Sequence, residues 1–198
     1  MLWCGLIGTT AADTPGRFDY YLLSLSWSPQ YCATSAKSGD SQCQRPYAFV
    51  VHGLWPQHER GYPESCGRGE YLDESLIRRL LPIMPSKALI IHEWKKHGVC
   101  SGLSADGYFS TLTKAYRSIR IPDRYQGLDR YLTTTVAAVE RDFLSANPAL
   151  SPDMIALQCS GQYLREVRLC MNRELQPRAC GADVRDRCGK SVVLRPTR

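Results

Sequence analysis

The chain has 198 residues, of which 43% are hydrophobic, and its formal net charge at pH 7 is +6. This hydrophobic content excludes an intrinsically disordered chain, and the length suits one domain with a sizeable core. The positive charge favours a polyanionic partner, although a basic composition is only a weak pointer. No stretch after the N-terminus is long and apolar enough to span a membrane.

Cysteine content is the strongest compositional signal, because the chain has nine cysteines. Cys4 stands apart near the N-terminus, and no Cys-x-x-Cys spacing occurs, which argues against a zinc knuckle or a thioredoxin-like motif. The other eight can form four disulfides, which implies the periplasm, the secretory pathway or the cell exterior. These eight are Cys32, Cys43, Cys66, Cys100, Cys159, Cys170, Cys180 and Cys188.

The first 16 residues are set apart from the rest. Met1 to Gly8 is a short apolar run, and small residues that suit cleavage follow it at 9–13. No basic residue precedes the run. We interpret residues 1–16 as a signal-peptide remnant or a disordered N-terminus, and residues 17–198 as a single domain.

In the first half of the chain, residue patterns predict two strands separated by a loop. Residues 17–28 are rich in aromatic and aliphatic side chains and predict a buried strand. Residues 31–46 predict a loop that a Cys32–Cys43 bridge would close. Residues 47–55 predict a second strand that ends at Pro56, and residues 57–71 predict an exposed loop.

The remainder alternates helical and strand patterns. Helices are expected from Asp73 to about Leu81, from Lys87 to His97 with Gly98 as the stop, after Ser104, and from Thr133 to Ser145. Strands are expected at 154–159, 163–171 and 191–194, with a basic loop or hairpin at 173–190. These elements predict an α+β fold in which several helices pack on a mainly antiparallel, disulfide-stapled sheet.

The most distinctive stretch is 90–100, Ile-Ile-His-Glu-Trp-Lys-Lys-His-Gly-Val-Cys. On a helix of about 100° per residue, four of its polar side chains fall within less than half of the circumference. These are His92, Glu93, Lys96 and His97. A solvated charged face is the simplest alternative, but few surface helices place two imidazoles, a carboxylate and an ammonium on one side.

Three kinds of chemistry can use these residues. A zinc site is disfavoured, because His92 and His97 are five positions apart, one too many for a zincin helix, and Lys96 lies between them. A covalent mechanism has no Gly-x-Ser-x-Gly nucleophile, and the cysteines are expected to be oxidised. General acid–base catalysis with cationic support remains, and RNA cleavage needs only those groups, because RNA carries its own 2′-hydroxyl nucleophile.

Two segments resemble the active-site motifs of one family. The stretch at 52–56, His-Gly-Leu-Trp-Pro preceded by Phe-Val-Val, resembles the first active-site segment of the ribonuclease T2 family, and 92–100 resembles the second. The strand with Trp27, the loop between Cys32 and Cys43, and the strands at 157–159 and 164–167 are also similar to that family, so the resemblance covers most of 18–194.

The resemblance implies a role for each residue of the motifs. His97 matches the general base, and His52 matches the general acid. His92 matches the histidine that holds the phosphate. Glu93 and Lys96 match the pair that supports the pentacovalent phosphate and tunes His97; a direct Glu93–His97 pair suits their helical spacing.

The resemblance also implies a base pocket and a disulfide pattern. Trp55 matches an aromatic residue that stacks on a base, and Tyr62 is a second candidate for stacking. Gln57 stands where some relatives have an acidic residue, which leaves the base preference open. The implied disulfides, in addition to Cys32–Cys43, are Cys66–Cys100, Cys159–Cys188 and Cys170–Cys180.

The sequence therefore predicts a secreted or periplasmic endoribonuclease. We expect a monomer without metal or other cofactor that cuts single-stranded RNA through a 2′,3′-cyclic phosphate to a 3′-phosphate, with low base specificity and no cleavage of DNA. The alternatives are an inactive RNA-binding or toxin-like protein and a zinc hydrolase. Arginines at 165–187 are expected to form mainly a solvated surface.

Overall fold

The computed structural model describes residues 13–36, 39–63 and 66–197. Most of the N-terminal segment, for which a signal-peptide remnant is expected, and Cys4 with it, therefore lie outside the described residues. Its last residues form a turn in which the Arg17 amide donates to the Thr14 carbonyl, and the Gly16 amide donates to the Cys100 carbonyl at 2.9 Å.

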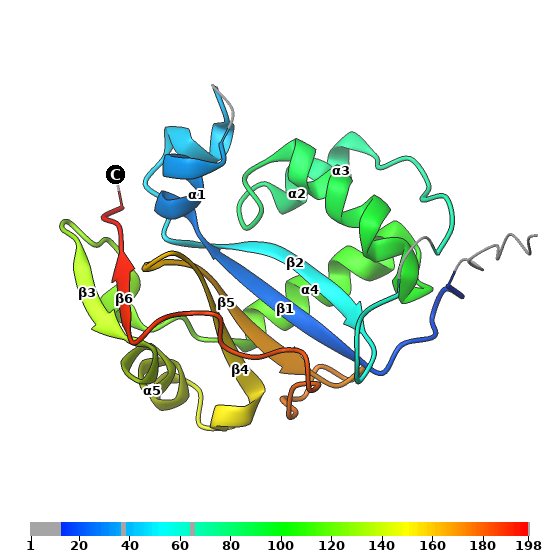
Figure 1. The fold of residues 1–198 in the computed structure, drawn as a ribbon. Coiled ribbons are helices and arrows are strands. Elements are labelled where there is room, and N and C mark those ends of the chain that lie inside the picture. Colours follow the sequence, from blue (N-terminus) through cyan, green and yellow to red (C-terminus); the bar gives the residue numbers. More distant parts are fainter. Residues whose placement is uncertain (1–12, 37–38, 64–65, 198) are drawn as a thin grey trace, which may run out of the picture.

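A mixed, mainly antiparallel sheet forms the centre of the molecule (Figure 1). Its strands run in the order β2-β1-β5-β6-β3, and β4 pairs with β5. All pairs are antiparallel except β5 with β6. The strands are β1 (Tyr20–Trp27), β2 (Phe49–Gln57), β3 (Leu132–Thr135), β4 (Ile155–Ser160), β5 (Tyr163–Met171) and β6 (Ser191–Leu194).

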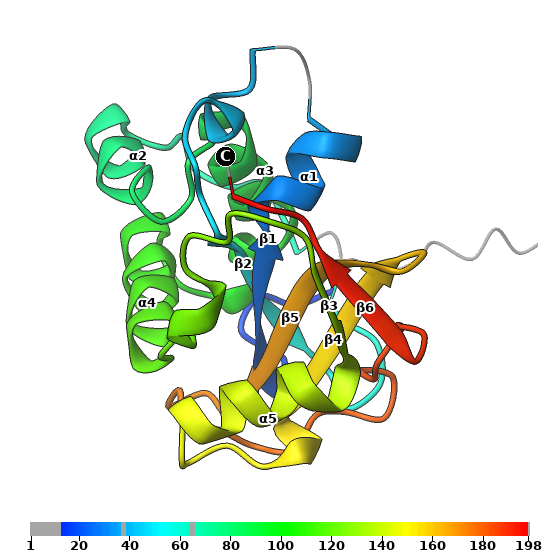
Figure 2. The ribbon, with the colours of Figure 1, turned by 90° about the vertical axis from the view of Figure 1, so that its left-hand side faces the viewer.

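Helices pack around both ends of this sheet. The α-helices are α1 (Ser28–Thr34), α2 (Glu74–Leu80), α3 (Lys87–Lys96), α4 (Ala105–Ser118) and α5 (Val136–Ala146). Figures 1 and 2 show α2, α3 and α4 gathered beside β1 and β2, whereas α5 lies by β3 and β4. In the part of the chain that the structure describes, no helix is long and apolar enough to cross a membrane.

Short 3-10 helices connect several of these elements. They are η1 (Ser41–Gln44), η2 (Gly98–Ser101), η3 (Asp123–Tyr125) and η4 (Pro152–Met154). The predicted α+β fold with a mainly antiparallel sheet is confirmed. Side-chain caps mark the expected helix starts: Asp73 accepts from the Ser75 amide, Ser86 from the Leu89 amide and Ser104 from the Gly107 amide.

The two faces of β1 carry different side chains, which are apolar toward the core and include two serines on the opposite face. Leu23, Leu25 and Trp27 point into the main core, because successive side chains of a strand alternate between faces. Leu22 and two serines, Ser24 and Ser26, occupy the other face. The core side of the sheet is therefore apolar, and the opposite face leaves room for larger side chains from the neighbouring strands.

Three element predictions were wrong in detail. The expected loop at 31–46 includes the C-terminal part of α1, so Cys32 lies on a helix. Strand β2 continues through Pro56 to Gln57, because β2 is an edge strand and a proline there removes no hydrogen bond from a second neighbour. The helix expected from Thr133 begins only at Val136, because the preceding threonines pair as β3 and Thr135 caps the helix.

Among the residues that the structure describes, four disulfides form: Cys32–Cys43, Cys66–Cys100, Cys159–Cys188 and Cys170–Cys180. The first is the bridge expected to close the loop at 31–46, and the other three are the pairs that the family resemblance implies. The Cys66–Cys100 bridge joins the loop after β2 to η2, directly after α3, and closes 34 residues. It therefore ties together the two segments that carry the sequence motifs.

Removing this bridge should destabilise the protein more than removing a bridge that closes a shorter loop. In the chain-entropy account, loss of the Cys66–Cys100 bridge lowers the free energy of unfolding by about 4 kcal/mol, and loss of Cys32–Cys43, which spans 11 residues, by about 3 kcal/mol. Urea unfolding of the two double alanine variants measures the difference. A larger loss for the shorter loop would contradict this ranking.

Candidate active site

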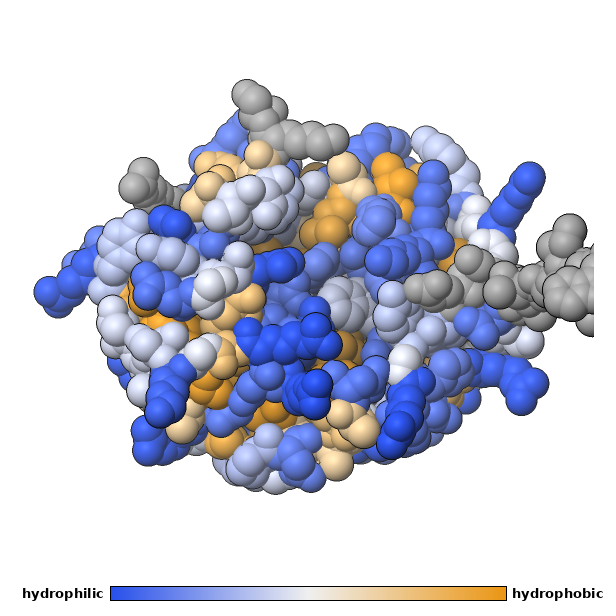
Figure 3. All heavy atoms as spheres, viewed as in Figure 1, coloured by the Kyte–Doolittle hydropathy of each residue, from blue (hydrophilic) through white to orange (hydrophobic). Residues whose placement is uncertain are grey.

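The predicted site residues line one cavity between α3, β2 and β5. They are His52, Trp55, Gln57, Tyr62, His92, Glu93, Lys96 and His97. In the space-filling view, strongly hydrophilic side chains gather over the middle of this face of the sheet (Figure 3). Two motifs that are separated in the chain thus form one polar site.

His52 lies at a β-bulge in β2. Ser24 pairs with Gly53 and Leu25 pairs with Val51, so His52 is the additional residue opposite β1. Residues of β2 that point into the core are Phe49, Val51 and then Leu54, whereas His52, Trp55 and Gln57 line the cavity. The bulge therefore brings Trp55 and Gln57 to the same face of β2 as His52.

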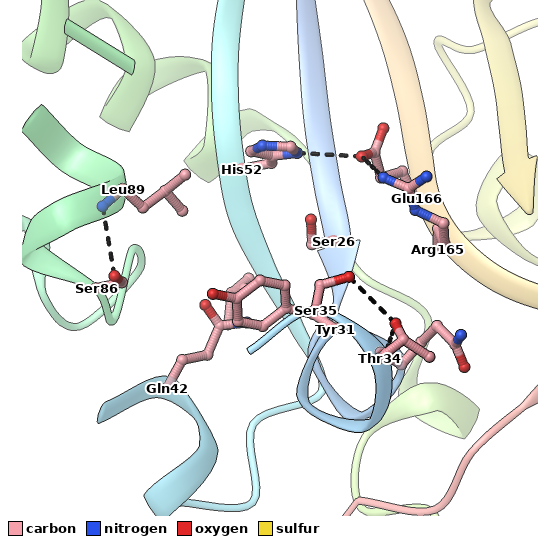
Figure 4. A pocket seen from close by; sticks show the side chains of 12 residues that line it. Ser26, Tyr31, Thr34, Ser35, Gln42, His52, Ser86, Leu89, Arg165 and Glu166 are labelled. Atoms are coloured by element: carbon pink, nitrogen blue, oxygen red, sulfur yellow. Dashed lines mark hydrogen bonds and ion pairs between the residues drawn. The ribbon is translucent and has the colours of Figure 1, made fainter. Parts of the chain in front are cut away.

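The imidazole of His52 lies between two carboxylates. Its Nδ1 is 3.2 Å from Oε1 of Glu166, and its Nε2 is 3.6 Å from Oε1 of Glu93. Figure 4 shows His52 of β2 and Glu166 of β5 pointing toward one another across β1. Burial lowers the pKa of His52, but the hydrogen bond to Glu166 and the charge of Glu93 outweigh burial, and the net effect is a raised pKa.

His97 has the opposite environment. It caps the C-terminal end of α3 and is buried, with its ring centroid 5.2 Å from that of Trp55. Burial, followed by the charge of Lys96 and the neighbouring His52 and His92, lowers the pKa of His97 to about 3. At neutral pH His97 is therefore a neutral imidazole, whereas His52 is biased toward its protonated form.

His92 and Lys96 lie on the exposed side of α3 and line the cavity. Partial burial and the charges of Lys96 and His52 lower the pKa of His92. An anion in the cavity would have the reverse effect, because negative charge stabilises the imidazolium. These two side chains therefore bring an imidazole and an ammonium group to the exposed side of the cavity.

Glu93 is buried, and its carboxylate contacts His52 and Trp55. The Trp55 indole Nε1 donates to Oε2 of Glu93 at 2.6 Å. Burial raises the pKa of Glu93 although His52 and Trp55 act against this shift. The Glu93 carboxylate therefore faces His52 and Trp55, and a direct tuning of His97 by Glu93 stays a prediction.

Gly53 is required where β2 approaches α3. A Cβ atom on Gly53 would lie 2.2 Å from Oε2 of Glu93 and 2.3 Å from Nε1 of Trp55. Both distances are far below van der Waals contact, so a side chain here would displace the two partners of the hydrogen bond.

The three predicted substrate-binding residues differ in exposure. Tyr62 is exposed, with its ring centroid 6.2 Å from that of His97. The guanidinium of Arg168 lies 5.1 Å from the centroid of Trp55, which restricts that indole ring. Gln57 is buried, and its amide nitrogen donates to the Pro56 carbonyl at 2.9 Å.

Sequence reasoning missed Glu166, which supports His52 from a third strand. The sequence at 164–167 resembles the family, but no local spacing indicates that Glu166 contacts His52. The two residues lie on β5 and β2, which are separated in the sheet by β1. Strand β5 carries three charged residues, Arg165, Glu166 and Arg168, and Glu166 is the one that is buried, at 3% exposed. A carboxylate beside arginines in a strand of the core sheet is the signal that could have found it. Glu166 also borders a second cavity beside His52, with Ser26, Tyr31 and Leu89 (Figure 4).

The arginines at 165–187, which are expected to form mainly a solvated surface, differ in their surroundings. Arg165, Arg168 and Arg187 line the cavity of the predicted site. Arg178 forms two hydrogen bonds with the Glu59 carboxylate, so its charge is already paired. Within the described ranges, no group of three or more His, Cys, Asp or Glu side chains could hold a metal ion.

Comparison with known proteins places this geometry in a family. The model of the ribonuclease T2 family matches residues 18–180. The chain belongs to the ribonuclease T2 family. It is 37% identical to a ribonuclease of Aeromonas hydrophila over 166 residues, which are 83% of this chain and 76% of the relative. It is 36% identical to a probable ribonuclease of Haemophilus influenzae, over 54% of this chain and 45% of the relative.

Solved structures share the fold. An RNase-related protein from Calystegia sepium matches with a TM-score of 0.75 and 23% identity over 91% of this chain and 98% of the other. A variant of RNase MC1 in complex with 5′-UMP matches with a TM-score of 0.70 and 21% identity over 88% of this chain and 97% of the other. Together with the ribonuclease relatives, family membership confirms the prediction of an endoribonuclease.

The close approach at Gly53 yields a prediction. In Gly53→Ala the Cβ displaces Trp55 and Glu93, so we expect the Trp55 indole N–H signal to lose its hydrogen-bonded NMR shift and the stability to fall by about 1–3 kcal/mol. Gly189→Ala is the matched control, because nothing lies within 4 Å of a Cβ at Gly189. Equal stability of the two variants with an unchanged Trp55 signal would contradict this account.

Proposed function

We propose that this member of the ribonuclease T2 family cleaves single-stranded RNA by metal-independent transfer of the phosphodiester to the 2′-hydroxyl. The observation that supports it is the pair of cavity histidines whose pKa values move in opposite directions. An acid–base mechanism needs one imidazole neutral and one charged at the same pH, and two contrasting environments supply that difference.

In this mechanism His97 is the general base. Its neutral imidazole removes the proton from the 2′-hydroxyl, and the oxygen attacks the adjacent phosphorus. The pKa of His97, lowered by burial to about 3, keeps the ring unprotonated across the physiological range, but also makes it a weak base. Binding of an anionic phosphodiester raises the basicity of His97, because negative charge opposes the effect of Lys96.

His52 is the general acid. It donates the Nε2 proton to the departing 5′-oxygen, and the products are a 2′,3′-cyclic phosphate and a free 5′-hydroxyl. Hydrolysis of the cyclic phosphate to a 3′-phosphate uses the same two histidines in reversed roles. Glu93 faces Nε2 and holds Trp55, so it supports the acid and the pocket wall together.

Cationic groups stabilise the charge on the pentacovalent phosphate. His92 and Lys96 lie at the mouth of the cavity on consecutive turns of α3, and an ammonium or imidazolium there compensates the developing negative charge. Glu93 completes the pair that the family resemblance implies with Lys96.

Base recognition relies on stacking. Trp55 and Tyr62 offer aromatic faces, which accept every base, and Gln57 offers an amide instead of a carboxylate. Because aromatic stacking accepts every base, these residues imply low base specificity. The second cavity beside His52 offers room for the nucleotide on the other side of the scissile phosphate.

The four disulfides support maturation in an oxidising compartment, which agrees with a secreted or periplasmic enzyme. Such an enzyme acts on RNA outside the cytosol.

Digestion of a short RNA and its DNA analogue in EDTA, with products identified by mass, tests the function. We expect a cyclic phosphate from RNA and intact DNA, because DNA lacks the 2′-hydroxyl. His52→Ala and His97→Ala should each lose about 100-fold or more of the activity, whereas His58→Ala, which alters a histidine next to Asp19, should lose none. Cleavage that requires added zinc would contradict the proposal, and no cleavage under any condition would leave an RNA-binding protein.

The pH profile of kcat/KM should be bell-shaped with a broad plateau. Activity falls at low pH as His97 becomes protonated and falls at high pH as His52 loses its proton, and the shifts move the two limbs apart. In Lys96→Ala the acid limb should move to higher pH, because loss of the ammonium raises the pKa of His97. A profile that stays flat from pH 3 to 9 would contradict the assignment.

A further inference from the structure

Glu166 is a buried carboxylate that neither sequence motif includes. It is 3% exposed on β5, and its Oε1 lies 3.2 Å from Nδ1 of His52. Since Nε2 of His52 faces Glu93 and the cavity, the two ring nitrogens have separate environments. The contact with Glu166 therefore determines which way the imidazole plane is turned.

The Glu166 carboxylate is itself fixed. Its Oε2 accepts from Nε of Arg168 at 2.9 Å, with Nη2 of Arg168 2.7 Å away, and from the Ser24 hydroxyl at 3.3 Å. Nη2 of Arg165 lies 3.7 Å from Oε1. Charge-assisted bonds of this kind are short and directional, so Glu166 is a rigid acceptor for the histidine.

The sheet makes this contact possible. His52 is on β2 and Glu166 is on β5, with β1 between them, so their backbones are about 10 Å apart. On this face β1 carries Ser24 and Ser26, and larger residues there would block the path between the two strands. The small side chains of Ser24 and Ser26 therefore make room for the contact between His52 and Glu166.

Charged groups line the cavity with His52 from three segments. From α3 come Glu93, Lys96 and His92, together with His97 at its end; β5 contributes Glu166, Arg168 and Arg165, and the loop before β6 contributes Asp183 and Arg187. Burial opposes ionisation of Glu166, but His52 and Arg168 outweigh it and lower its pKa to about 2, whereas burial raises the pKa of Glu93. Glu166 is therefore ionised at neutral pH and balances the imidazolium.

We propose that Glu166 is the positioning residue of the general acid: its carboxylate, held by Arg168 and Ser24, orients the His52 imidazole through Nδ1 and directs Nε2 to the leaving oxygen. This inference rests on the proposed function. Glu166 keeps its charge throughout the reaction, and the proton that leaves comes from Nε2 alone.

Two substrates separate an effect on the acid from a general structural effect. A dinucleoside phosphate needs a proton on its leaving 5′-oxygen, whereas the 4-nitrophenyl ester of uridine 3′-phosphate releases a stable phenolate without one. Glu166→Gln keeps the shape but removes the charge, and Glu174→Gln, which alters an exposed glutamate in the loop after β5, is the matched control. His52→Ala is the reference for complete loss of the acid.

For Glu166→Gln we expect kcat on the dinucleoside phosphate to fall about tenfold or more, with little change on the nitrophenyl ester. The alkaline limb should move about one pH unit lower, because an opposite charge no longer favours the imidazolium. Glu166→Asp keeps the negative charge but moves it away from His52 by the length of one methylene group. In this variant the alkaline limb of the pH profile should stay near its original pH, whereas kcat should still fall. Equal losses on both substrates, or an unmoved limb, would overturn the inference.

NMR titration of the His52 ring answers the same question without turnover. In the wild-type protein His52 should titrate above the usual histidine range, and in Glu166→Gln it should titrate lower. A wild-type value at or below the usual range would overturn the inference even if the variant does not fold. Full activity of His52→Ala would instead refute the proposed function, while the titration would still report whether Glu166 holds the ring.

Discussion

The β-bulge at His52 is the constraint on which the polar face depends. One additional residue in β2 changes the spacing of its core residues from two to three between Val51 and Leu54. Without the bulge, Trp55 and Gln57 of β2 would point into the core, because a one-residue change of register exchanges the faces of a strand. The adjoining Gly53 then allows the strand to approach Glu93 without a clash.

This geometry gives His52 and His97, which lie in one cavity, opposite electrostatic environments. The bulge places His52 between two carboxylates, while His97 lies at the end of α3, where the neighbouring charges of Lys96, His52 and His92 all lower its pKa. Burial alone lowers the pKa of either imidazole. Neighbouring charge therefore differentiates the two histidines, and one buried site can hold a neutral and a charged imidazole together.

Rigid support surrounds this site on each side. The Cys66–Cys100 bridge fixes the loop after β2 to the end of α3, and the β5 side chains Glu166 and Arg168 brace His52 and Trp55. Catalytic groups need such support, because a general acid works only when its proton lies within hydrogen-bond reach of the leaving oxygen.

The sequence by itself determined the fold class, the helix starts at Asp73, Lys87 and Ser104, and the two segments that form the site, because capping and hydrophobic periodicity are local properties. Only the tertiary structure decided that β2 continues through Pro56, that Glu93 contacts His52, and that Glu166 reaches it across β1. Those features depend on strand order and register, which arise from pairing between residues far apart in the chain, and no local pattern encodes them.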